Sequence, residues 1–192
     1  MARPFVHLNC AIDARGRVAG PGGRPAKIST DADFRRVHQL RANYDAILVG
    51  SGTILADDPS LRVKAEYAEG PDPIPVILDG RLRTPPGARV IRPATRIYHH
   101  ADGAVDGATC IRVAGPPLDL HAVLDDVHAA GIRHVLVEGG PTVMQAFAAA
   151  GLWDTWTVFQ ADIDLEDGPT LGPLPDGTSR AMEGGALWTF NP

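Results

Sequence analysis

The chain has 192 residues and a formal net charge of −5, with 44% hydrophobic and 21% charged residues. This composition is typical of a folded protein of about one domain, and the negative charge argues against nucleic-acid binding. Two cysteines, Cys10 and Cys110, make neither a disulfide framework nor a zinc pattern, so no metal is expected. No apolar run reaches the roughly 18 residues of a membrane span, and no signal peptide is recognisable. We therefore expect a cytoplasmic protein without membrane partners.

The first predicted elements are a strand and a helix. Residues 5–12 predict the strand, and residues 13–28 predict a loop rich in glycine, proline and arginine. Thr30, with Asp33 three residues later, resembles a capping box and predicts the start of the helix. The apolar positions expected to face inward are Val6, Leu8, Cys10 and Ile12 in the strand, and Phe34, Val37 and Leu40 in the helix.

Strands and helices continue to alternate along the chain. Gly50-Ser51-Gly52-Thr53 is expected to turn a short buried strand into a short helix ending at Asp57-Asp58-Pro59. Asp119 begins an amphipathic helix that Gly131 ends. The predicted strands are 46–49, 75–78, 96–100, 109–113, 134–137, 155–160 and 187–190, and another helix is predicted over 142–150.

This alternation predicts an α/β fold with a largely parallel sheet, in which ligands bind beyond the carboxyl ends of the strands. Glycine-bearing turns follow three of the predicted strands, at 50–52, 79–80 and 139–140. Together they outline a cleft for an extended phosphate-bearing ligand such as a dinucleotide. The first helix is not opened by the G-x-G-x-x-G pattern of a standard Rossmann site.

The segment 135–142, Val-Leu-Val-Glu-Gly-Gly-Pro-Thr, is the most informative one. An apolar strand ends in the carboxylate of Glu138, and two glycines lead into a helix. Phosphate binds well to the backbone N–H groups at such a positive helix end, and glycines let a ligand approach the backbone closely. An ordinary strand-to-helix turn is the alternative interpretation.

The run 41–61, RANYDAILVGSGTILADDPSL, resembles a signature of the riboflavin-biosynthesis reductases. This family comprises the C-terminal reductase domain of the bifunctional deaminase/reductase and its stand-alone relatives. Blocks at 76–81, 137–142 and 151–154 are similar to further family blocks, and their order agrees over roughly residues 4–165. The resemblance implies a dihydrofolate-reductase-like fold, with a largely parallel central sheet flanked by helices in a single domain over 1–192. It also implies NADPH as cofactor and a homodimer.

The reaction implied by the resemblance reduces a phosphoribosylaminopyrimidine. Hydride reaches C1′ of the ribose in its ring-opened imine form and gives a ribitylamino product. By position, the resemblance assigns the cofactor to Ala11, Thr53, Asp57, Gly80, Gly139, Gly140, Pro141, Thr142 and Val143. It assigns the substrate to Arg41, Leu61, Lys64 and Glu138. Folds of this kind often have a cis peptide between the paired glycines, and we predict one at Gly139–Gly140.

The chemistry of these residues is consistent with the implied roles. Arg41 can clamp a substrate phosphate and Lys64 can add a second positive charge, although Arg41 could equally be a solvated helix end. Arg81 and Arg83 follow the presumed cofactor strand and are candidates for a cofactor 2′-phosphate, or are simply exposed. The choice between NADPH and NADH is open from sequence alone.

One loop departs from the family pattern, in which the first strand usually ends Ser-x-Asp-Gly. Here Asp13 stands at the serine position and Arg15 at the aspartate position. Because a carboxylate can stabilise a protonated imine, Asp13 and Glu138 are both catalytic candidates. The reversed charge at Arg15 leaves two alternatives open: a reductase of a pterin, dihydrofolate or another pyrimidine, and a non-catalytic nucleotide-binding protein.

Overall fold

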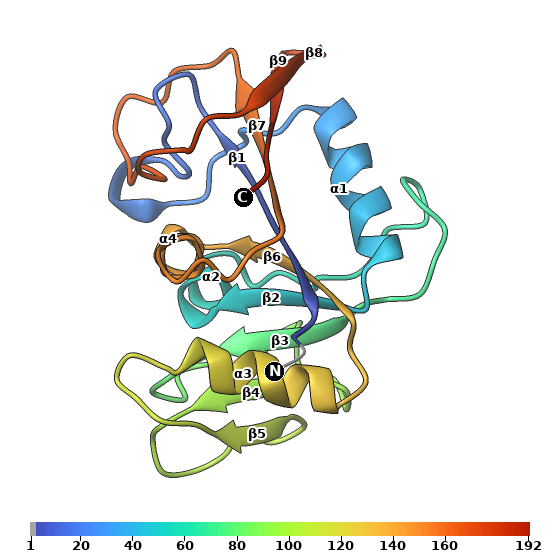
Figure 1. The fold of residues 1–192 in the computed structure, drawn as a ribbon, viewed down its shortest axis with the longest axis vertical. Coiled ribbons are helices and arrows are strands. Elements are labelled where there is room, and N and C mark those ends of the chain that lie inside the picture. Colours follow the sequence, from blue (N-terminus) through green and yellow to red (C-terminus); the bar gives the residue numbers. More distant parts are fainter. Residues whose placement is uncertain (1–2) are drawn as a thin grey trace.

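The computed structural model describes residues 3–192 and contains one nine-stranded sheet with the order β5-β4-β3-β2-β6-β1-β7-β9-β8 (Figure 1). The strands are β1 (Phe5–Ile12), β2 (Ala46–Gly50), β3 (Ile74–Leu78), β4 (Arg96–His99), β5 (Thr109–Arg112), β6 (His134–Gly139), β7 (Thr155–Ala161), β8 (Thr178–Met182) and β9 (Gly185–Phe190). The α-helices are α1 (Asp31–Asn43), α2 (Ser51–Asp57), α3 (Leu120–Ala129) and α4 (Pro141–Ala149), and a short 3-10 helix, η1 (Pro21–Gly23), precedes them. The strand pairs are parallel except β7–β9 and β8–β9.

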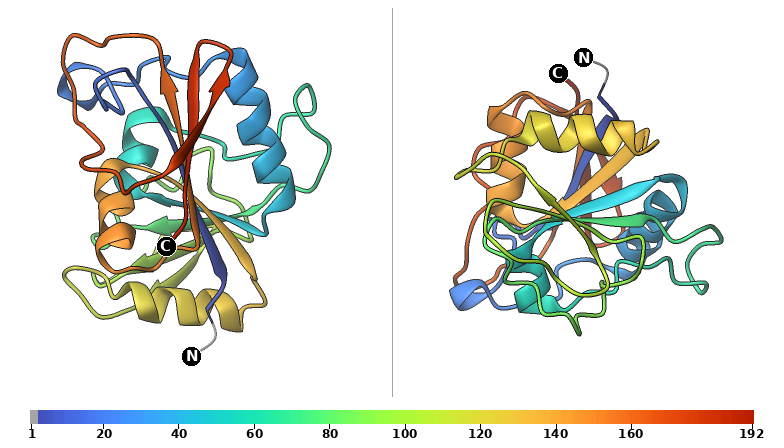
Figure 2. Two further views of the ribbon diagram at one scale, coloured as in Figure 1. Left: turned by 45° about the horizontal axis from the view of Figure 1, so that its top comes forward. Right: turned by 90° about the horizontal axis from the view of Figure 1, so that it is seen from below.

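Successive residues of the central strands enter two different cores, as the period of two of a β-strand requires. Val135 and Val137 of β6 pack with α3 and α4, whereas Leu136 between them packs on the opposite side near α1 and α2. Figures 1 and 2 show helices on both sides of the sheet. Because both faces are covered, the central strands are continuous apolar runs.

The predicted α/β sheet, largely parallel, is confirmed, and the predicted elements lie within a few residues of the observed ones. Thr30 caps α1 by accepting a hydrogen bond from the Asp33 N–H, as expected. The expected inward face of α1 is wrong in part, because Phe34 is 36% exposed while Asp33 and His38 are buried. Strand β8 was not predicted, since most of its residues are exposed and it pairs only with β9.

Within residues 3–192 no helix is both long and apolar enough to span a bilayer. The same residues contain no group of three or more His, Cys, Asp or Glu side chains placed to hold a metal ion. The carboxyl ends of β1, β2, β3 and β6 meet at one edge of the sheet, and a large cavity opens there.

Candidate active site

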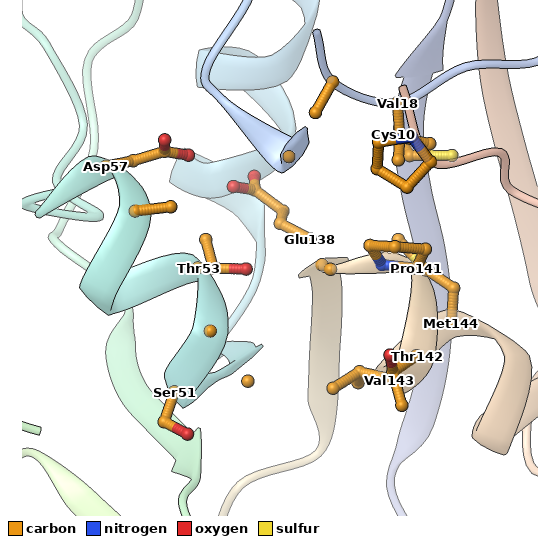
Figure 3. Close-up of a pocket in the computed structure, with 18 of the residues that line it drawn as sticks. Cys10, Val18, Ser51, Thr53, Asp57, Glu138, Pro141, Thr142, Val143 and Met144 are labelled. Atoms are coloured by element: carbon orange, nitrogen blue, oxygen red, sulfur yellow. The ribbon is translucent and has the colours of Figure 1, made fainter. Parts of the chain in front are cut away.

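The cavity at this edge has a volume of about 880 Å³. All nine positions that the resemblance assigns to the cofactor line it: Ala11, Thr53, Asp57, Gly80, Gly139, Gly140, Pro141, Thr142 and Val143. Figure 3 shows Ser51, Thr53 and Asp57 along α2 opposite Pro141, Thr142 and Val143 at the start of α4, with Glu138 between them. The fold therefore brings residues from four separate strand ends to one concave site.

The start of α4 is built from backbone rather than from side chains. Gly140 is the N-cap residue and provides no side-chain cap, and Pro141 occupies the first turn. The Gly139–Gly140 peptide is cis, as predicted. A Cβ atom added to Gly140 would lie 3.5 Å from Thr53 Oγ1, and one added to Gly139 would lie 3.7 Å from it. The space between α2 and α4 is therefore open because Gly139 and Gly140 have no side chains. An anionic ligand can approach the helix N-terminus closely here.

Glu138 lies at an irregularity in β6. Leu48 pairs with Val137, but the next residue, Val49, pairs with Gly139, so Glu138 is the extra residue of a bulge. Bulges re-aim side chains next to functional sites. The carboxylate of Glu138 points to the cavity, which it lines, and is largely buried, with a side-chain exposure of 9%.

Arg41 holds this carboxylate in a bidentate ion pair. Arg41 Nε donates to Glu138 Oε1 at 3.0 Å and Nη2 donates to Oε2 at 2.6 Å. Nη1 donates to the carbonyl oxygen of Arg62 at 3.3 Å. The guanidinium is thus engaged on all three nitrogens, and in this arrangement it orients Glu138.

The other residues expected on the substrate side lie outside the cavity lining. Leu61 is buried, with a positive φ of 51°, and packs in the core near α1 and α2. Lys64 is exposed, and its Nζ lies 3.8 Å from Glu66 Oε1 and 5.5 Å from the centre of the Tyr67 ring. Of the four expected substrate residues, only Glu138 lines the cavity, and Arg41 reaches it through Glu138.

His38 connects this segment to α1. Its Nδ1 accepts a hydrogen bond from the Lys64 N–H at 3.2 Å, which fixes where the chain turns after Leu61. Burial, helped by the positive charge of Arg41, lowers the pKa of His38 to about 4. The ring is therefore neutral near pH 7 and available as an acceptor.

Asp13, the second carboxylate considered for catalysis, does not line the cavity. It is completely buried and accepts hydrogen bonds from the N–H groups of Arg15, Arg17 and Leu165, and from Arg17 Nη1 at 2.9 Å. Burial alone would raise the pKa of Asp13, but these donors outweigh it and lower the pKa to about 2. In this position the carboxylate closes the turn after β1.

Arg15 is likewise not among the residues that line the cavity. Its Nη2 lies 2.8 Å from Asp164 Oδ2, and both side chains are well exposed. Asp164 Oδ1 also accepts from Arg17 at 2.8 Å, so the loop after β1 and the segment after β7 are joined by one ion-pair cluster. The charge reversal noted in the sequence therefore lies on the surface.

Phe34 and His100 are among the lining residues to which sequence reasoning gave no role at the site. Phe34 reaches the cavity from the first turn of α1, and His100 from the end of β4. His100 Nε2 would lie 2.9 Å from a Cβ added to Gly80, so this glycine is needed for the close packing of the two strand ends. Such contacts join segments far apart in the sequence, and no local pattern marks them.

The comparison with protein families decides the relationship. A model described as the RibD C-terminal domain matches residues 4–172. The chain belongs to this family. Among its relatives is a protein of Methanothermobacter thermautotrophicus named 2,5-diamino-6-ribosylamino-4(3H)-pyrimidinone 5′-phosphate reductase, 38% identical over 162 residues. The match covers 79% of this chain and 74% of the relative. A protein of the same name from Archaeoglobus fulgidus is 33% identical, with 88% and 86% covered.

Solved structures agree with this assignment of the RibD C-terminal domain fold. A deaminase/reductase from Thermotoga maritima, named for 5-amino-6-(5-phosphoribosylamino)uracil reduction, has a TM-score of 0.84 at 26% identity. The match covers 99% of this chain and 57% of that one. Dihydrofolate reductase from Enterococcus faecalis has a TM-score of 0.58 at 12% identity, with 97% and 95% covered, so the dihydrofolate-reductase-like fold is confirmed.

Proposed function

We propose that this RibD C-terminal domain protein is an NADPH-dependent reductase of a phosphoribosylaminopyrimidine, and that residues 1–192 act as a single reductase domain. Hydride transfer to C1′ of the ring-opened imine would give a ribitylamino product. The observation that carries the proposal is one cavity that joins all nine expected cofactor positions to the carboxylate of Glu138. The names of the relatives supply the substrate class.

The residues fit a dinucleotide. A cavity of about 880 Å³ is in the usual range for cofactor sites, roughly 300–1,000 Å³. The glycine turn before α4 offers backbone donors to a pyrophosphate, and Thr53 and Asp57 line the facing wall along α2. When bound, NADPH supplies the hydride, and the protein supplies orientation and a site with little water.

Glu138 is the residue to which we assign contact with the electrophile. Both of its oxygens accept from Arg41, so the carboxylate is held in one orientation at the cavity wall. In that orientation it can accept a hydrogen bond from a substrate N–H or hydroxyl and stabilise the positive charge of a protonated imine. We therefore assign this role to Glu138 and assign the buried Asp13 to the turn after β1.

A preference for NADPH over NADH is supported by Arg81 and Arg83. Both line the cavity beside Gly80, beyond the end of β3. A guanidinium there can bind a 2′-phosphate, which NADH lacks. On the substrate side, Lys64 is the expected phosphate ligand that stays exposed. A homodimer, implied by the family resemblance, is also proposed.

The sequence departure at Arg15 supported the alternative of a different substrate. That support is weaker in the structure, because Arg15 pairs with Asp164 and does not line the cavity. The decisive experiment follows NADPH absorbance with a phosphoribosylaminopyrimidine, its dephosphorylated form and a dihydropterin. We expect turnover of the phosphorylated pyrimidine above the other two. Turnover of the dihydropterin alone would support the pterin alternative, and NADPH binding without any turnover would support a non-catalytic protein. Light scattering of the purified protein tests the homodimer.

A further inference from the structure

The inference concerns how the arginine expected at the cofactor phosphate is held, and it rests on the proposed use of NADPH. Arg83 lies in the loop between β3 and β4, where long side chains are usually mobile. Its Nη2 nevertheless donates to Ser51 Oγ at 2.9 Å. Ser51 is the first residue of α2 and is buried, and both residues line the cavity. The Arg83 guanidinium is therefore held by the Ser51 hydroxyl at the start of α2.

Ser51 lies beside a buried carboxylate. Gly50 and Leu78 are paired across β2 and β3, and Ser51 and Asp79 each follow one residue later. Asp79 is completely buried, and its Oδ2 accepts from the N–H and the hydroxyl of Thr84, both at 2.7 Å. These two bonds close the loop that carries Arg83.

The other oxygen of Asp79, Oδ1, is buried and has no hydrogen-bond partner among the described residues. Although burial acts to raise the pKa of Asp79, hydrogen bonds from the loop, at Arg83 and Thr84, lower it overall. Asp79 therefore holds the loop that carries Arg83 and leaves the Ser51 oxygen available to the guanidinium.

We propose that Ser51 and Arg83 form a pair that sets the preference for NADPH. The Ser51 oxygen accepts a hydrogen bond from Arg83 Nη2 and holds the guanidinium at the cavity wall, where it can bind the 2′-phosphate. Ser51 is a positioning residue in this arrangement, because it acts through Arg83. Its hydroxyl lowers the entropy that Arg83 loses when the cofactor binds.

The test measures the dissociation constants of NADPH and NADH by calorimetry for wild type, Ser51→Ala, Arg83→Ala and the double variant. Ser179→Ala, on the exposed strand β8, is the matched control. We expect Ser51→Ala to weaken NADPH binding by about three- to tenfold and Arg83→Ala by more than tenfold, with NADH affinity unchanged in both. In the double variant, the loss of Ser51 should add nothing to the loss of Arg83.

Each outcome separates the Ser51–Arg83 pair from the proposed function. If Arg83→Ala weakens NADPH binding and Ser51→Ala does not, the pairing proposal is wrong and the NADPH site stands. If Ser51→Ala weakens the binding of NADPH and NADH equally, the hydroxyl only supports the fold of α2, and the pairing proposal is again wrong. If the wild type binds neither cofactor, the proposed function fails and the pairing proposal fails with it.

Discussion

Arg41 at the end of α1 holds Glu138 at the end of β6 in a bidentate ion pair, with N–O distances of 3.0 and 2.6 Å. The two residues are 97 positions apart in the sequence. Both side chains are largely buried, at 17% and 9% exposure, and Glu138 also lines the cavity. Arg41 is therefore placed to orient a carboxylate, and the expectation that it clamps a substrate phosphate has to be tested against this role.

Replacing Arg41 with Ala leaves the Glu138 carboxylate largely buried and without its partner. We expect a loss of about 3 kcal/mol in the free energy of unfolding, measured by urea denaturation. The value of kcat/KM should fall at least tenfold on the phosphorylated and the dephosphorylated pyrimidine alike, while the dissociation constant of NADPH changes little. Loss on the phosphorylated substrate alone would show instead that Arg41 contacts the phosphate.

Lys64 provides the matched comparison for the substrate phosphate. Its ammonium is exposed and near Glu66, so Lys64→Ala should change stability by less than about 1 kcal/mol. If it binds the phosphate, KM for the phosphorylated substrate should rise by roughly tenfold. Steady-state kinetics on both substrate forms checks this, and equal KM changes on the two forms would exclude the phosphate role.

Gly140 tests the placement of the cofactor. Its φ of −75° is open to any residue, and an added Cβ meets only Thr53 Oγ1 at 3.5 Å, so Gly140→Ala should fold normally. Gly140→Leu fills the space at the start of α4 and should raise the dissociation constant of NADPH by tenfold or more, about 1.4 kcal/mol. Unchanged calorimetric binding in the leucine variant would place the cofactor elsewhere.

Asp13 is expected to matter for stability rather than for chemistry. Asp13→Ala removes the acceptor of three backbone N–H groups and of Arg17, and should cost about 3 kcal/mol. The folded fraction should keep kcat within about threefold. Asp164→Ala, at an exposed partner of Arg17, is the control and should cost less than about 1 kcal/mol. A large kcat loss in folded Asp13→Ala protein would return Asp13 to the catalytic candidates.

The buried ring of His7 should make the free energy of unfolding depend on pH. Its Nδ1 lies 2.6 Å from the Tyr44 hydroxyl and Nε2 lies 2.8 Å from Thr157 Oγ1. Burial, and then the charge of Arg36, lower the pKa of His7 to about 4. The His7 ring takes up a proton near pH 6.5 in the unfolded chain and near pH 4 in the folded one. The contribution of neutral His7 to the free energy of unfolding is therefore complete above pH 6.5 and is lost as the pH falls from 6.5 to 4.

Urea denaturation at several pH values measures this effect. Each buried histidine of this kind contributes a slope of up to about 1.4 kcal/mol per pH unit, and His38 acts in the same direction. His7→Gln should make the curve between pH 6.5 and 4 shallower. An identical slope in wild type and variant would mean that His7 titrates alike in both states.

Much of the fold could be predicted from local patterns. The apolar runs at 46–49 and 134–137 are strands because β-type residues are buried on both faces, and Asp119 and Gly131 bound α3 as caps do. Strand β8 was not predicted because its residues show no strand pattern, and it forms a strand only through its pairing with β9. The inward face of α1 was misjudged because its buried side chains are polar.

The cofactor wall could likewise be predicted, because glycine turns after strands are local and parallel strands bring their carboxyl ends to one edge. The partner of each charged side chain could not be predicted from the sequence. The family resemblance made Arg41 and Asp13 candidates for the site and marked Arg15 as a reversed charge near it, yet long-range contacts turn Arg15 to Asp164, Arg41 to Glu138 and Asp13 to the N–H of Leu165. Composition and periodicity determined the sheet and its ligand edge, whereas tertiary packing decided which charged groups face the cavity, since a buried charge must find a partner that sequence distance does not reveal.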